Sequence, residues 1–372
     1  VSGQFEAALD RAHLKVSSGA FDYKSAIKSA VDSLADTMKY VTYPTGHTDT
    51  LEVACRRAVL TGVNQTGAKL QVARADEMGV EFFETTAHGG ARPSHAEWQG
   101  RQFHRGGAVD YMGKHYPDFE AATAYGTGAG LCGWNCRHTF FAIFPELGAP
   151  PAWTQESLEA LNARDIEYNG GRYTRYEISQ MQRARERTVR KYKRRYLAED
   201  AAGADTTASA VKLRQARQKL SDFISATGGR ADSARTSVAG FGRSEAGKAS
   251  YTARKQERFD SANVELQQMR EAGTIKAKGK LIESPPAPNE INFASEHVLQ
   301  RWAERGMGPM DAERIIRSSK VAMSQRNGTQ ICYYSEYGFV AIGQNGNVSS
   351  IGPLDEGGQK LMEVVKKHGI PH

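Results

Sequence analysis

The feature that most constrains this chain is a concentration of cysteine and histidine residues between positions 88 and 138. This stretch of the 372-residue sequence holds two of the four cysteines and five of the ten histidines. Cys132, Cys136 and His138 lie close together, and His88 and His95 precede them by roughly forty residues. Thiol and imidazole groups are ligands of zinc, so one shared site would require a fold that joins two distant loops.

Three interpretations of these residues remain open. Cys132, Cys136, His138 and one of His88 or His95 are candidate ligands of a tetrahedral structural zinc site, although the spacing is not that of a known zinc finger. Alternatively, the segment is a metal-free packed loop, with the imidazoles bonded to buried carbonyl groups and the cysteines acting as small apolar side chains. The third interpretation is catalysis by Cys132 or Cys136 with a nearby histidine, but no feature marks either thiol as activated.

Composition narrows the class of protein. Four cysteines are too few for a disulfide scaffold in a chain of this length, so we expect reduced thiols, as in a cytosolic setting. No run approaches the roughly 18 apolar residues of a membrane-spanning helix, so no membrane span is expected. A hydrophobic content of 40% indicates real cores diluted by polar helices, and the length suits two or three domains.

Periodicity and composition together predict an α+β protein in five parts. Apolar residues at three- and four-residue spacing predict helices near the N-terminus, with a turn at 43–46 and a stop near Gly79. The next part is rich in Gly and aromatic residues, which favours irregular loops with short strands. The predicted parts are a helical N-terminal region (1–80), a Gly-rich Cys/His core (81–153), a basic helical arm with flexible segments (154–283), a Pro-rich linker (284–290) and a C-terminal α+β domain (291–372).

The last part has the pattern of two helices followed by an antiparallel meander. We expect helices at about 294–305 and 309–319 and strands that include 330–334 and 338–342. The Gly/Asn-rich segment 343–347 predicts a hairpin turn after the second of these strands.

Basic residues concentrate between positions 172 and 195, where ten Arg or Lys accompany two Glu. Interleaved with tyrosines, they wrap around a predicted helix and suit the backbone of a nucleic acid, without a visible base-specific element. The alternative is a solvated helix that packs against an acidic neighbour. The candidate nucleic-acid-binding residues are Arg183, Arg185, Arg187, Arg190, Lys191, Lys193, Arg194 and Arg195.

Several long strings between Tyr40 and Arg195 resemble the phage minor capsid protein 2 family, which is related to the head-morphogenesis proteins of tailed phages. The strings, in order, are AVLTGVNQT (58–66), HGGARPSHAEWQG (88–100), YGTGAGLCGWNCRH (125–138), YTRYE (173–177) and QRARER (182–187). After the third string this chain is more apolar than the family pattern, which predicts a strand at 139–145 packed against the Cys/His residues.

The resemblance implies a structural protein of the virion, placed in the head interior or at the portal and made in the host cytoplasm. Its implied partners are portal and capsid proteins, with packaged DNA as a further candidate, and its implied role is head assembly or DNA delivery. The resemblance does not itself imply an enzyme.

The C-terminal domain resembles, more distantly, the phage-associated ribonuclease toxins of the barnase, EndoU, colicin and RelE type. That resemblance implies a metal-independent ribonuclease acting on host RNA, with a histidine acid/base, cationic groups on the phosphate and hydroxyl donors from the sheet. The alternative is an interaction domain without catalysis. The candidate catalytic residues are His297, Arg301, Arg326, Tyr334, Ser349 and Ser350.

Overall fold

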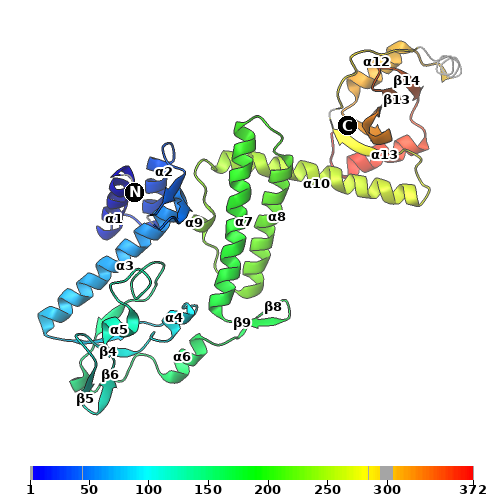
Figure 1. Cartoon of the computed structure of the whole chain (residues 1–372). Helices are drawn as coiled ribbons and strands as arrows, with labels where there is room; N and C mark the ends of the chain where they lie inside the picture. The colour runs from blue at the N-terminus through cyan, green and yellow to red at the C-terminus, as the bar shows by residue number, and fades with distance from the viewer. Residues whose placement is uncertain (1–2, 44, 284, 294–304, 372) are drawn as a thin grey trace. The chain divides into compact units, whose positions relative to one another are not determined.

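The structure is a computed structural model that describes residues 3–43, 45–283, 285–293 and 305–371. Helices and small antiparallel sheets make up the fold (Figure 1), which confirms the predicted α+β class. The chain forms two compact units, which consist of residues 1–204 with 212–246 and residues 205–211 with 247–372.

The N-terminal region is helical, as predicted. Helix α2 begins where the Asp22 carboxylate accepts hydrogen bonds from the backbone N–H groups of Lys24 and Ser25. Its apolar stripe, from Ala26 to Leu34, is buried in a core shared with α1 and α3. Helix α3 ends at Gly79 in the left-handed conformation, with a φ of 64°. The elements are α1 (Gly3–Ser17), α2 (Tyr23–Leu34), β1 (Tyr40–Thr42), β2 (Thr48–Thr50) and α3 (Leu51–Met78).

The Gly-rich core consists of short elements around aromatic side chains. A three-stranded antiparallel sheet with the order β4-β3-β7 packs Phe83 and Phe140 against Phe119 of α5, in the same cluster as Cys132 and Cys136. Strand β7 is the strand predicted next to the Cys/His residues. The elements are β3 (Phe82–Thr85), α4 (Pro93–Ala96), β4 (Gln102–His104), β5 (Val109–Tyr111), β6 (Lys114–Tyr116), α5 (Phe119–Thr123), β7 (Phe140–Ala142) and η1 (Pro145–Leu147).

Two glycines explain why the loop before β7 is so rich in this residue. A Cβ atom on Gly130 would lie 1.9 Å from the carbonyl oxygen of Ala124, and one on Gly133 would lie 2.5 Å from that of Gly128. At both positions the backbone of the loop approaches another backbone segment so closely that only glycine, which has no Cβ atom, fits. This tight loop places Cys136 and His138 close to the segment that carries His95.

Long helices follow this core. Helix α7 begins with a capping box, in which the Thr174 hydroxyl and the Glu177 carboxylate each accept from the other residue's backbone N–H group. The elements are α6 (Gln155–Leu161), β8 (Ile166–Tyr168), β9 (Gly171–Tyr173), α7 (Arg175–Ala201), α8 (Thr207–Thr227), α9 (Ser233–Thr236) and α10 (Arg243–Glu271).

The C-terminal unit contains a five-stranded antiparallel sheet with the order β10-β11-β12-β13-β14. Alternate residues of β12 enter opposite cores: Cys332 and Tyr334 pack with α10 and α13, and Tyr333 packs with α12. The elements are β10 (Lys280–Glu283), α12 (Pro309–Ser318), β11 (Val321–Gln325), η2 (Arg326–Gly328), β12 (Gln330–Ser335), β13 (Gly338–Gly343), β14 (Val348–Gly352) and α13 (Glu356–Lys367).

This unit differs from the sequence-based expectation in two ways. Strand β10 precedes the Pro-rich segment 284–290 and pairs with β11, so the sheet includes residues on both sides of the expected linker. The hydroxyl of Tyr333 also donates to the Pro286 carbonyl oxygen at 2.6 Å, which holds that segment against the sheet. Helix α13 was not predicted, although its apolar residues have helical spacing. The helix expected at 294–305 lies almost wholly outside the described residues.

The four cysteines are free thiols with buried side chains. Among the described residues, no helix is both long and apolar enough to cross a bilayer.

Candidate functional site: an arginine-lined cavity and a Cys/His cluster

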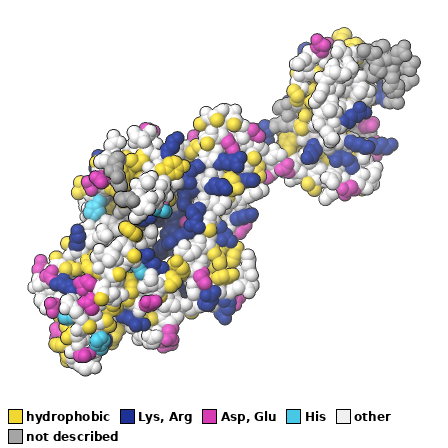
Figure 2. Space-filling view, viewed as in Figure 1, with side chains coloured by type: hydrophobic (Ala, Val, Ile, Leu, Met, Phe, Trp, Pro, Cys, Tyr) yellow, Lys and Arg dark blue, Asp and Glu magenta, His cyan; other side chains and the backbone are white. Residues whose placement is uncertain are grey.

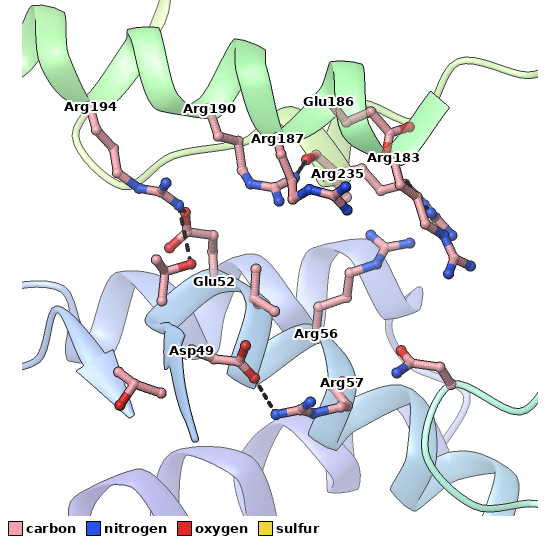
Figure 3. A pocket seen from close by; sticks show the side chains of 15 residues that line it. Asp49, Glu52, Arg56, Arg57, Arg183, Glu186, Arg187, Arg190, Arg194 and Arg235 are labelled. Carbon is pink, nitrogen blue, oxygen red and sulfur yellow. Dashed lines mark hydrogen bonds and ion pairs between the residues drawn. The ribbon is translucent and has the colours of Figure 1, made fainter. Parts of the chain in front are cut away.

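An open cavity of about 520 Å³ lies in the first unit, between the N-terminal half of α3 and helix α7. Figure 2 shows Lys and Arg side chains gathered in a hollow of this unit. In the close view of Figure 3, the arginines of α7 and Arg56 of α3 point toward one another across the cavity. The charged lining residues are Asp49, Glu52, Arg56, Arg57, Arg183, Glu186, Arg187, Arg190, Arg194 and Arg235.

The cavity carries an excess of positive charge, because seven arginines and three carboxylates line it, a difference of four. Part of this charge is compensated within the protein. Glu52 pairs with Arg194, and the Arg190 guanidinium donates to the Arg235 carbonyl oxygen. Further pairs are Arg57 with Asp49, Arg56 with Asp232 and Arg235 with Glu186.

Several guanidinium N–H groups of the cavity have no acceptor within the part of the chain that the structure describes. Nη1 of Arg56 and Nε of Arg183 and Arg190 are buried and have no hydrogen-bond partner among the described residues. A buried donor without a partner costs about 1–3 kcal/mol. Burial, followed by neighbouring arginines, also lowers the pKa of both Arg183 and Arg190. The described part of the protein therefore leaves these three N–H groups without a hydrogen-bond acceptor.

The structure divides the eight basic residues predicted to bind nucleic acid. Four of them line the cavity: Arg183, Arg187, Arg190 and Arg194. Two lie at exposed positions outside its lining, namely Lys191 and Arg195. The Arg195 guanidinium pairs with Glu199 one turn further along the helix.

The other two basic residues pack within the unit. The Arg185 guanidinium lies 4.0 Å from the ring centroid of Phe223 and donates to the Tyr168 hydroxyl at 3.1 Å. Lys193 is buried, and its ammonium group donates to the Thr236 carbonyl oxygen at 2.6 Å. Both side chains therefore have partners within the first unit, and neither lines the cavity.

Sequence reasoning missed the cavity residues outside α7. Arg56 and Arg57 lie next to the buried Cys55 on α3, and Arg235 is on the four-residue helix α9. Adjacent arginines beside a buried position were a weak signal for Arg56 and Arg57. We find no comparable sequence signal for Arg235.

The Cys/His cluster lies beside a second cavity, of about 250 Å³, which shares Asn135 and Arg183 with the first. His95 is on α4, whereas Cys136 and His138 are in the loop before β7. The Cys136 Sγ atom lies 3.7 Å from His95 Nδ1 and 3.6 Å from His138 Nδ1. All three side chains line the second cavity.

The outer nitrogens of both rings have fixed roles. His95 Nε2 lies 3.0 Å from the Ala129 carbonyl oxygen and must carry a hydrogen to bond to it. His138 Nε2 lies 3.0 Å from Gln99 Oε1, which also accepts from the His88 backbone N–H at 3.1 Å. That atom is therefore the amide oxygen, and His138 Nε2 also donates. In the neutral rings both Nδ1 lone pairs consequently face the thiol.

Burial disfavours the charged forms of all three side chains. It lowers the pKa of His138 to about 3, with the nearby His88 and His95 contributing, and it also lowers the pKa of His95. Burial raises the pKa of the Cys136 thiol. A nucleophilic cysteine requires a lowered pKa, so this environment does not favour catalysis by the thiol.

Two of the five predicted metal ligands are outside this cluster. Cys132 Sγ lies 3.5 Å from the His138 carbonyl oxygen, and Cys132 is not among the three grouped ligands. The His88 ring stacks on the His138 ring with 4.2 Å between centroids, and its buried Nε2 atom has no partner among the described residues.

A long-range contact fixes the loop that carries Cys136 and His138. The side-chain amide of Asn64 on α3 donates to the carbonyl oxygens of Cys136 at 3.3 Å and His138 at 3.2 Å. Sequence reasoning assigned no role to Asn64 or Gln99, although both belong to the strings that carry the family resemblance.

In the second unit, Arg326, Tyr334 and Ser350 line an open cavity of about 1140 Å³. Tyr334 is largely buried, which raises the pKa of its hydroxyl. The Ser349 hydroxyl donates to the Ala341 carbonyl oxygen and accepts from Gln330. The remaining predicted catalytic residues, His297 and Arg301, lie outside the described residues.

Comparison with known proteins identifies the first part of the chain. The family model described as phage minor capsid protein 2 matches residues 1–225, which is more than half of the sequence. No curated protein and no solved structure matches the chain. The match includes the Cys/His cluster and the cavity residues of α3 and α7. The chain therefore belongs to the phage minor capsid protein 2 family and is a structural protein of the phage particle.

Proposed function

We propose that this minor capsid protein lies in the head interior, at the portal vertex, and binds phosphate groups of the packaged DNA in its arginine-lined cavity. The observation that carries the DNA contact is a group of buried guanidinium N–H donors on Arg56, Arg183 and Arg190, for which the described residues supply no acceptor. The head-interior and portal positions rest on family membership alone.

A phosphate diester matches the chemistry of the cavity. Guanidinium groups present donors in a fixed planar arrangement that suits two oxygens of one phosphate, and arginine supplies every cationic side chain of the lining. Contacts of this kind position a protein on DNA without reading its sequence. We therefore expect binding that depends strongly on salt and little on DNA sequence.

An acidic surface of a portal subunit is the competing occupant of the same cavity. It would satisfy the same N–H donors with carboxylates, as the internal pair of Glu52 with Arg194 does. DNA binding distinguishes the two occupants. If the cavity holds a portal carboxylate and not a DNA phosphate, removal of one cavity arginine should leave the affinity for DNA unchanged.

Two exposed arginines on the same helix provide a matched test. Arg187 lines the cavity, whereas Arg195 does not line it and pairs with Glu199. Fluorescence anisotropy of the full chain with two unrelated DNA duplexes should show weaker binding by Arg187→Ala on both. The magnitude of the slope of log K against log salt should fall by about 0.9 for each lost phosphate contact.

Arg195→Ala should bind DNA nearly as the parent does. Equal losses for the two variants would indicate a general effect of positive charge on α7. No loss for Arg187→Ala would remove the cavity from the DNA interface and favour the portal surface as its occupant.

A second candidate function is RNA cleavage by the second unit. It is favoured by one observation: Arg326, Tyr334 and Ser350, all predicted from the sequence as catalytic, line the same cavity. Arg326 would bind a phosphate, and the two hydroxyl groups would donate to it. Cleavage of labelled RNA by the full chain, abolished in His297→Ala and reduced in Arg326→Ala, would support this function. Equal activity of parent and both variants would remove it.

A further inference from the structure

The three side chains of the Cys/His cluster have the spacing of ligands around one small cation. Bonds of about 2.3 Å to sulfur and 2.05 Å to nitrogen, at a tetrahedral angle, place the two ligand atoms roughly 3.6 Å apart. The Cys136 Sγ atom lies 3.7 Å from Nδ1 of His95 and 3.6 Å from Nδ1 of His138. All three ligand atoms lie within 4.8 Å of one another.

Hydrogen bonding within the protein does not satisfy this arrangement. The Cys136 thiol has a single hydrogen, yet two imidazole lone pairs face it at nearly equal distance. The thiol can donate to one of them, and the other is left without a donor. A divalent cation would accept both lone pairs and a thiolate at the same time.

We propose that His95 Nδ1, Cys136 Sγ and His138 Nδ1 bind a zinc ion, with the fourth ligand supplied by a water molecule from the adjoining cavity. The ion replaces the thiol proton, which is released to solvent on binding. No described fourth side chain joins the three ligands, and all three line the cavity of about 250 Å³.

The surroundings orient the two imidazoles for this role. Metal-binding histidines commonly donate their second ring N–H to a carbonyl or carboxylate group, which fixes the tautomer and the ring orientation. Here the Ala129 carbonyl oxygen accepts from His95 and Gln99 Oε1 accepts from His138. Both acceptors are in place in the metal-free structure.

The bound ion would join segments that have little regular structure of their own. Helix α4 is four residues long, and the loop with Cys136 and His138 has no regular structure before β7. A single helical turn is unstable in isolation. A metal ion shared by the two segments would therefore contribute directly to the stability of the Gly-rich core.

The neighbouring thiol provides the matched control. Cys132 and Cys136 are both buried and four residues apart, but only Cys136 belongs to the ligand group. The full chain, purified without chelator and dialysed, should contain one zinc ion by inductively coupled plasma mass spectrometry. Cys132→Ser should retain that ion, and Cys136→Ser and His138→Gln should retain at least about ten-fold less.

Cobalt substitution tests the same ligands without any mutation. The parent protein and Cys132→Ser should show a thiolate-to-cobalt charge-transfer band together with the visible bands of a tetrahedral ion. If Cys136→Ser does not fold, as judged by circular dichroism, this spectrum still decides the question in the parent protein. Absence of zinc and of the cobalt spectrum from the parent would overturn the proposal, as would loss of metal in Cys132→Ser with retention in Cys136→Ser.

Discussion

Replacing Gln99 by Met tests whether the amide oxygen of that side chain holds the Cys/His cluster in place. Gln99 is fully buried, and its Oε1 atom accepts from the His88 backbone and from His138 Nε2. Met has a similar length but no acceptor of comparable strength. The buried His138 Nε2–H and the partly buried His88 N–H then lose their partner, at about 1–3 kcal/mol for a buried group, so we expect the first unit to lose roughly 3 kcal/mol of stability.

The assay is urea unfolding of the full chain, followed by tryptophan fluorescence in the presence of EDTA. Trp98 packs against the rings of His95 and His138, so its emission reports on this core. EDTA separates the hydrogen-bond effect from any effect of metal. The control is Gln155→Met at an exposed position on α6, where a change within about 0.5 kcal/mol is expected. Equal effects of the two substitutions would refute the reasoning about Gln99.

Two further predictions concern the first unit. Gly130→Ala places a Cβ atom 1.9 Å from the Ala124 carbonyl oxygen and should destabilise the unit by about 2–3 kcal/mol. The control is Gly67→Ala, at an exposed and open position within α3, which should stabilise the first unit by about 0.5–1 kcal/mol. Loss of stability in both variants would contradict this account of the loop. Burial lowers the pKa of Lys193 from 10.5 to about 8. Below pH 8 the buried ammonium group therefore lowers the free energy of unfolding, and this destabilisation is lost between pH 8 and 10.5 as the folded protein releases the proton. The unfolding free energy of the parent should therefore rise across this window by up to about 3 kcal/mol relative to Lys193→Met, and parallel pH profiles of the two proteins would exclude the effect.

Much of the fold was predictable, because local signals agreed with the tertiary structure. The apolar spacing from Ala26 to Leu34 and the stop at Gly79 gave the N-terminal helices. Strand β10 was not predictable from its own four residues, because it is defined by pairing with β11 across the Pro-rich segment. Pairing partners depend on the whole sheet, and a proline run by itself resembles a linker.

The candidate sites were predictable by residue type and less so by arrangement. The Cys/His concentration was visible in the sequence, but the choice of Cys136 over Cys132 depends on how the Gly-rich loop turns. The arginines of α7 were visible too, whereas their division between cavity, core and surface depends on packing. Arg56 and Arg235 enter the cavity from other elements, so only the fold brings them to it.

The most direct test of the central claim is ultraviolet cross-linking of purified phage heads, followed by mass spectrometry of nucleotide-bearing peptides. DNA-filled heads should contain this protein, with nucleotide adducts on peptides from the cavity-lining part of α7 (183–194), and empty heads should lack those adducts. Heads that contain no copy of the protein would contradict the account. Adducts confined to peptides outside the cavity would contradict it equally.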